Sequence, residues 1–234
     1  MHRLNLLFTL SSLSVLLVTI ERFSFTTQVF LQPYNFLRLH ELVQMIIIIL
    51  FTVIIPALLL REVTQNFSSI KQKEFLLILT FIVGVYFYAT GNGVHEIGSF
   101  FFNNYCDVSN FSGNICGGFF INDYYLGNIL YFVGGFMMIS ALLLLEYKRP
   151  NKTYAKKDLL IMVINAVVYA FAIFAYAAFD RVLVGLVYSI ITTIFAVYLF
   201  MLVRKKYLEF PVITYTALTY SLGTITAVVF KLLR

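Results

Sequence analysis

Seven apolar runs divide this chain, and they limit the folds open to it more than any other feature. A helix of roughly 20 residues crosses the hydrocarbon core of a bilayer, which is about 30 Å thick. Charged residues make up only 12% of the 234 residues, whereas soluble domains carry about 25%. The sequence therefore predicts an all-α, polytopic integral membrane bundle of about seven transmembrane helices, in the plasma membrane or an equivalent membrane. The predicted spans, which form a single domain over residues 1–234, are about Leu4–Ile20, Leu42–Leu60, Phe75–Glu96, Tyr124–Leu145, Leu159–Phe179, Val182–Val203 and Val212–Leu233.

The distribution of Lys and Arg among the connecting segments predicts the orientation. Twelve of the 17 basic residues lie on the side of the N-terminus, and five lie on the other side. Because cytoplasmic loops carry the excess of Lys and Arg, we expect the N-terminus inside and the C-terminus outside. The net charge of +6 arises from these short loops. The basic residues do not form one patch, so we expect no nucleic acid as a partner.

The loop between the third and fourth runs has a different character from the basic loops. It contains Cys106 and Cys116 and has no Lys or Arg. On the charge argument it faces outward, where a disulfide can persist. We therefore expect a Cys106–Cys116 disulfide, and Asn110 is the only one of three Asn-x-Ser/Thr motifs expected on that side.

A stripe of polar residues follows the third run toward this loop. Tyr88, Asn92, His95, Ser99 and Asn103 fall on a single face if the helix continues without a break. Unpaired polar groups in hydrocarbon cost several kcal/mol, so such a stripe needs a function or a hydrogen-bond network. It indicates a site, a pathway or a network inside the bundle.

Histidines and carboxylates from several spans are expected at the same depth. His40 and Glu41 open the second span, His95 and Glu96 close the third, and Asp123 opens the fourth. A catalytic zinc takes three such ligands and leaves a fourth position for water. We expect His40 and His95 as metal ligands, together with one of Glu41, Glu96 or Asp123. A spare carboxylate of this set would serve as general base.

Four further polar residues are expected around this site, in the second shell or the pocket: Asn92, Gln44, Tyr88 and Asn128. The simpler interpretation is that the charged residues are solvated or paired at helix ends. Asp123 also has the type and position of a helix N-cap. The two members of each His-Glu pair point about 100° apart, so at most one of each faces a shared centre.

These patterns predict a membrane-embedded, metal-dependent hydrolase that acts on a lipid or lipid-linked substrate at the outer face. The alternative is a non-catalytic ligand-binding protein, a transporter or a subunit of a membrane complex that uses the same pocket. Membrane lipid and a lipid-like or small-molecule ligand are the expected partners.

The number of spans and the set of His and acidic residues resemble one superfamily of membrane hydrolases. It includes alkaline ceramidases and progestin/adiponectin-type receptors. Those proteins use two histidines in the last span, and Val212–Leu233 contains none. We therefore carry over no site residue from the resemblance.

Overall fold

The computed structural model describes residues 2–68, 71–107, 109–150 and 154–234. Within these ranges the secondary structure is helical, apart from an isolated β-bridge between Phe30 and Arg38. Seven helices are long and apolar enough to cross a membrane. The predicted all-α bundle of seven membrane-length helices is therefore confirmed. Insertion in a membrane and the direction of the chain remain predictions.

The helices follow the predicted runs but several extend beyond them. The elements are α1 (His2–Glu21), the 3-10 helix η1 (Phe25–Gln28), α2 (Leu39–Leu42), the π-helix η2 (Val43–Ile48), α3 (Ile49–Val63), α4 (Gln72–Tyr105), α5 (Ile115–Ile121), the π-helix η3 (Asn122–Gly127), α6 (Asn128–Lys148), α7 (Lys156–Phe179), α8 (Val184–Val203), the 3-10 helix η4 (Arg204–Glu209) and α9 (Pro211–Leu233).

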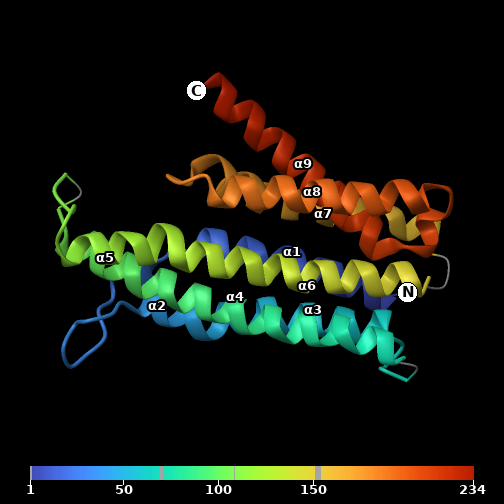
Figure 1. Ribbon diagram of the computed structural model, residues 1–234, viewed down its shortest axis with the longest axis horizontal. Coiled ribbons are helices and arrows are strands. Elements are labelled where there is room, and N and C mark those ends of the chain that lie inside the picture. Colours follow the sequence, from blue (N-terminus) through green and yellow to red (C-terminus); the bar gives the residue numbers. More distant parts are fainter. Residues whose placement is uncertain (1, 69–70, 108, 151–153) are drawn as a thin grey trace.

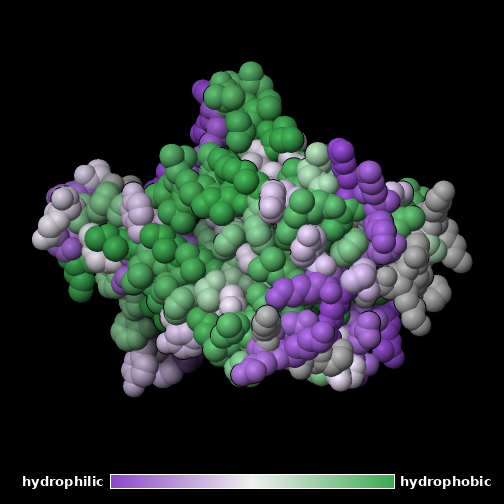
Figure 2. Space-filling view, turned by 45° about the vertical axis from the view of Figure 1, so that its right-hand side comes forward, coloured by the Kyte–Doolittle hydropathy of each residue, from purple (hydrophilic) through white to green (hydrophobic). Residues whose placement is uncertain are grey.

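Figure 1 shows α3, α4 and α6 running together along the long axis, with α7 and α8 beside them and α9 leaving at an angle. The most extensive contacts between helices join α4 with α6, α7 with α9, and α1 with α7. Hydrophobic side chains cover much of the face seen in Figure 2, and hydrophilic ones gather toward its lower right. Large apolar side chains such as Ile194 and Ile225 are more than half exposed. Such a surface is suited to contact with lipid.

Glycines at seven-residue intervals bring α4 and α6 into close contact. Gly84, Gly91 and Gly98 on α4 face Gly127 and Gly134, which lie at the end of η3 and on α6. A Cβ atom at Gly91 would lie 2.2 Å from the Tyr131 backbone nitrogen, and one at Gly134 would lie 2.3 Å from the Tyr88 nitrogen. No side chain fits at those separations, so the two backbones touch. This contact fixes the position of the polar face of α4 relative to η3.

Helix α1 contacts different partners along its length. Near its middle, Ser12 Oγ lies 2.8 Å from the Asn165 carbonyl oxygen on α7 and 2.9 Å from Tyr215 Oη on α9. In its last turns, Gln44 Nε2 of η2 donates to the Val18 carbonyl at 3.2 Å and to Glu21 Oε2 at 3.0 Å. These hydrogen bonds join α1 to α7 and α9 near its middle and to η2 near its end.

The start of α9 is held by a buried carboxylate from α6. Glu146 is fully buried. Its two carboxylate oxygens accept hydrogen bonds from the backbone N–H groups of Val212 at 3.0 Å and Ile213 at 2.7 Å. The first N–H groups of a helix have no partner within the helix itself. Glu146 therefore supplies from another helix the cap that α9 lacks locally.

The expected disulfide is present. The Cys106 and Cys116 sulfurs are bonded, and their Cα atoms lie 5.6 Å apart. Cys106 directly follows α4, and Cys116 lies in the first turn of α5. The bond closes the connection between the two helices at the α5 end of the bundle.

Candidate functional site

A large cavity lies among the helices and has a volume of about 1070 Å³. This is slightly above the range of roughly 300–1,000 Å³ for small-molecule sites. Helices α1, α3, α4, α6, α7, α8 and α9 all contribute to its wall. The charged groups form what we call the mouth: Arg22, Arg38, His40, His95, Glu96, Asp123, Asp180 and Arg181. Leu59, Leu142 and Leu143 belong to the apolar part of the wall.

The predicted polar stripe lies along this cavity. Helix α4 continues unbroken to Tyr105, so the five stripe residues share a face as expected. All five line the cavity: Tyr88, Asn92, His95, Ser99 and Asn103. Asn92 also donates from Nδ2 to the Gln44 carbonyl at 3.5 Å, a long hydrogen bond to η2. The stripe therefore forms part of the cavity wall and also contacts the second span.

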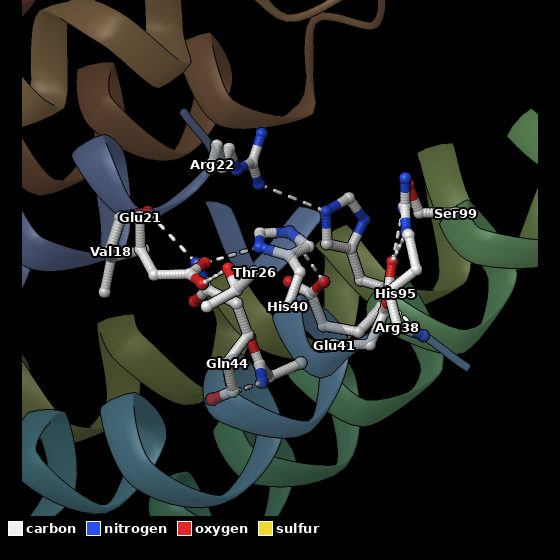
Figure 3. A network of polar contacts seen from close by, with 12 residues as sticks. Val18, Glu21, Arg22, Thr26, Arg38, His40, Glu41, Gln44, His95 and Ser99 are labelled. Atoms are coloured by element: carbon white, nitrogen blue, oxygen red, sulfur yellow. Dashed lines mark hydrogen bonds and ion pairs between the residues drawn. The ribbon is translucent and has the colours of Figure 1, made fainter. Parts of the chain in front are cut away.

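His40 lies between two carboxylates (Figure 3). Its Nδ1 forms an ion pair with Glu21, and its Nε2 lies 3.7 Å from Glu96 Oε2. Glu21 also accepts hydrogen bonds from Gln44 and Thr26. The end of α1 is therefore part of the polar network. No spacing in the sequence revealed this contact, because α1 and α2 are joined by a long loop.

His95 forms a second, separate set of contacts. Its Nδ1 lies 2.8 Å from Asp123 Oδ1 and 3.0 Å from the Asp123 carbonyl oxygen. Arg22 Nη2 lies 3.3 Å from Nε2 on the other side of the ring. A guanidinium can only donate, so Nε2 must accept and the proton of a neutral ring resides on Nδ1. We therefore assign His95 as a donor to Asp123, with Nε2 directed to Arg22.

Asp123 is not the N-cap of its helix, which corrects the simpler interpretation of this residue. The helix begins earlier, at Ile115, and Asn114 caps it by accepting from the Cys116 N–H at 2.9 Å. Asp123 lies inside η3 and is 2% exposed. Asn128 uses its Nδ2 group to donate to the carbonyls of Asp123 at 3.2 Å and Tyr124 at 3.1 Å. π-Helical turns such as η3 are frequent at functional sites.

Glu41 and Gln44 are placed differently from the other predicted residues. Neither is part of the cavity wall. Glu41 is buried and forms an ion pair with Arg38, whose Nε lies 2.9 Å from its Oε1. The Arg38 backbone N–H donates to the same carboxylate at 2.9 Å. Glu41 thus anchors the start of α2.

The predicted zinc ligands do not form one metal centre. Among the described residues, no three His, Cys, Asp or Glu side chains are arranged to hold a metal ion. His40 and His95 are instead each paired with a carboxylate, from Glu21 and Asp123 respectively. Their arrangement fits ion-pair networks better than a shared ligand set. The zinc ion stays a prediction from the sequence.

Tyrosines form the middle of the cavity wall, and only Tyr88 among them was predicted from the sequence. This tyrosine belt consists of Tyr88, Tyr131, Tyr169, Tyr176, Tyr188 and Tyr220. Tyr88 and Tyr131 share a hydrogen bond of 2.8 Å, and Tyr188 and Tyr220 share one of 2.6 Å. The Tyr176 hydroxyl has no hydrogen-bond partner among the described residues. Tyr in membrane proteins is enriched at the interfaces. Tyrosines far inside the spans were therefore the sequence signal that could have indicated this part of the cavity wall.

Two arginines at the mouth have no carboxylate partner within ion-pair distance in the described part of the chain. Arg22 contacts His95, and the Arg181 guanidinium carbon lies 5.6 Å from the centre of the Tyr124 ring. The pKa of Asp180 is raised by burial, although hydrogen bonding by the Val182 N–H and the nearby charges of His95 and Arg22 oppose that shift.

Comparison with protein-family models, with curated proteins and with solved structures finds no match to this chain. No relative's function therefore carries over to it. The fold and the cavity define its class directly: an all-helical protein with seven helices compatible with a multi-pass membrane protein.

Proposed function

We propose that this chain is an integral membrane protein that binds an amphiphilic ligand in the interhelical cavity. The polar head of the ligand lies at the mouth, and its apolar tail lies along the deeper wall. One observation carries the proposal: charged, hydroxyl-bearing and apolar side chains all line the same cavity of about 1070 Å³. The chain would be inserted with its N-terminus inside, as the distribution of Lys and Arg predicts.

The chemistry of the wall supports each part of this ligand. A charged head placed among Arg22, Arg181 and the mouth histidines keeps polar partners, which avoids the cost of burying it unpaired. An apolar tail against Met138, Leu142 and similar residues needs no partner at all. The unpartnered Tyr176 hydroxyl offers a hydrogen bond to a polar linkage between head and tail.

The outer halves of α1 and α7 supply a route from the bilayer to the cavity. Ile20 of α1 and both Phe171 and Phe179 of α7 line the cavity, yet each is about half exposed. A residue that is both cavity wall and outer surface marks a place where the wall is thin or open. In the described part of the chain, the hydrogen bonds between α1 and α7 lie farther from this place, at Thr9, Ser12 and Asn165. A lipid would therefore reach the cavity sideways, between these two helices.

Tryptophan fluorescence tests binding directly, because the chain contains no Trp. Phe132→Trp places a single indole in the cavity wall. An amphiphile with a brominated tail should quench this fluorescence saturably in protein purified in a non-brominated detergent. Phe81→Trp is the matched control, since Phe81 is equally buried but lies outside the cavity. Ile194→Trp, on the exposed surface, reports quenching from the detergent phase.

Saturable quenching at Phe132→Trp with little change at Phe81→Trp is the expected result. Equal, non-saturating quenching at all three positions would mean that the amphiphile only dissolves in the detergent, and it would overturn the proposal. A ligand-binding transporter or a complex subunit would give the expected result too, because each would use the same cavity.

Hydrolysis of the bound amphiphile is the second candidate activity. The observation in its favour is the contact of His95 with Asp123, which orients the imidazole as a general base needs. Release of fatty acid from an ester-linked amphiphile, with added zinc and after chelation, tests this activity. His95→Gln should abolish the release. Absence of release under both conditions in a preparation that binds the amphiphile would leave the protein as a binding protein.

A further inference from the structure

Two arginines at the mouth of the cavity have no ion pair among the described residues. Arg38 is paired with Glu41, and His95 lies against Asp123. Glu21 and Glu96 share His40, and Asp180 accepts a hydrogen bond from the Val182 N–H at 3.4 Å. Arg22 and Arg181 have no carboxylate within ion-pair distance in this part of the chain, and both are exposed. These two guanidinium groups are therefore available to an anion.

The two arginines come from different elements that both line the mouth. Arg22 directly follows α1, and Arg181 lies in the turn between α7 and α8. Both line the same cavity, as does Asp180 beside Arg181. A guanidinium offers several N–H donors in a plane and matches the oxygens of a carboxylate or phosphate group. Two of them at one mouth can bind a single anionic group together.

We propose that the amphiphile carries an anionic head, a carboxylate or a phosphate, which is held between Arg22 and Arg181 while its tail occupies the cavity. This inference rests on the proposed binding function and adds the charge and the position of the head. His95 Nε2 already contacts Arg22, so the head would share that guanidinium with the imidazole. The guanidinium of Arg181 lies over the Tyr124 ring, at 5.6 Å from its centre, which is a cation–π contact.

The Phe132→Trp chain serves as the reporter for this inference. Amphiphiles with one brominated tail and different heads are compared in the same detergent: carboxylate, phosphate monoester, zwitterionic phosphocholine, quaternary ammonium and neutral maltoside. We expect the two anionic heads to reach half-saturation at a concentration about tenfold lower than the neutral head. Comparison of carboxylate with phosphate then identifies the preferred anion.

Replacement of the arginines makes the test specific to the mouth. Arg22→Gln and Arg181→Gln should each weaken binding of the anionic amphiphiles by about tenfold, and weaken binding of the neutral maltoside by a much smaller factor. Arg234→Gln is the matched control, because it removes one positive charge from the exposed C-terminus without touching the cavity. It should change neither affinity.

Each failure has a distinct meaning. Equal affinity for all heads, or no effect of either arginine replacement, would overturn the anionic head while leaving the cavity as a binding site. Preference for the phosphocholine or ammonium head would overturn it as well. Absence of saturable quenching by any amphiphile would overturn the proposed function itself. Inorganic phosphate should compete only far above the amphiphile concentration. Competition at equal concentration would indicate a water-soluble anion instead.

Discussion

We expect the stability of the protein to depend on the contact between His95 and Asp123. Asp123 is 2% exposed, the His95 Nδ1–H donates to its backbone carbonyl, and Nδ1 lies 2.8 Å from its Oδ1. His95→Ala would remove that donor and the imidazole beside a buried carboxylate, at a cost of about 1–3 kcal/mol. We expect a lower melting temperature in detergent for His95→Ala. Adding Asp123→Asn to the same chain should recover part of the loss, since an amide carries no charge to leave unpaired.

This outcome separates the ion-pair network from the zinc site that the sequence predicts. If His95 were a zinc ligand at headgroup depth, its replacement would remove the metal and the activity but would cost little stability. An unchanged melting temperature for His95→Ala, together with zinc in the unmodified protein, would contradict the network and restore the metal centre.

Glu146 provides a second prediction at the level of a single residue. Its two oxygens accept from the first N–H groups of α9, and Gln can supply only one oxygen. We expect Glu146→Gln to lower the free energy of unfolding by about 1–2 kcal/mol. Glu209→Gln is the control, because Glu209 is partly exposed and its ion pair with Lys206 is 3.8 Å long. Thermal unfolding in detergent should show an effect within about 0.5 kcal/mol for that control. Equal losses in the two variants would contradict the capping role.

At the scale of the elements, the glycine contact between α4 and α6 makes a sharp prediction. Gly91→Ala would place a methyl group 2.2 Å from a backbone nitrogen, so the helices must separate or the protein must unfold. Gly93→Ala, two residues away, meets no atom within 4 Å. It should be neutral or slightly stabilising, since Ala favours helix over Gly by about 1 kcal/mol. Comparison of folded yield and melting temperature checks this, and similar behaviour of the two variants would refute the close contact.

The sequence could predict the elements but not all of their internal geometry. Apolar runs of membrane length identify the seven helices, because the length needed to cross hydrocarbon is a physical constant. The stripe from Tyr88 to Asn103 followed from helical periodicity alone. The π-helical turn η3, which holds Asp123, could not be predicted in this way, because π-turns depend on packing against a neighbour. Here the neighbour is the backbone of α4, which η3 contacts at Gly98 and Gly127.

The partners of the site residues were beyond prediction for a related reason. His40 meets Glu21 only because α1 ends beside α2, and Glu146 meets α9 only because α6 lies beside it. Both contacts join residues whose separation along the chain carries no periodic signal. Tyr188 and Tyr220 come together from α8 and α9 in the same way. Sequence patterns report one helix at a time, and these sites are made between helices.

At the scale of the whole molecule, the orientation is the principal prediction. A cysteine in place of Ser109, in the disulfide loop, should react with an impermeant maleimide added to intact cells. A cysteine in place of Lys205, exposed in η4, should react only after the membrane is opened. The reverse pattern would place the mouth of the cavity on the inner side and would contradict the charge argument.

The length of α4 determines how high the mouth stands in a bilayer. Its 34 residues extend for about 50 Å at 1.5 Å per residue, well beyond the roughly 30 Å of hydrocarbon. A bilayer whose inner edge meets Phe75 would have its outer edge near Val94, next to His95. A lipid that moves sideways into this protein would therefore keep its head at the height it already has. Its ionic group would stay hydrated throughout and would not have to enter the hydrocarbon core of the bilayer.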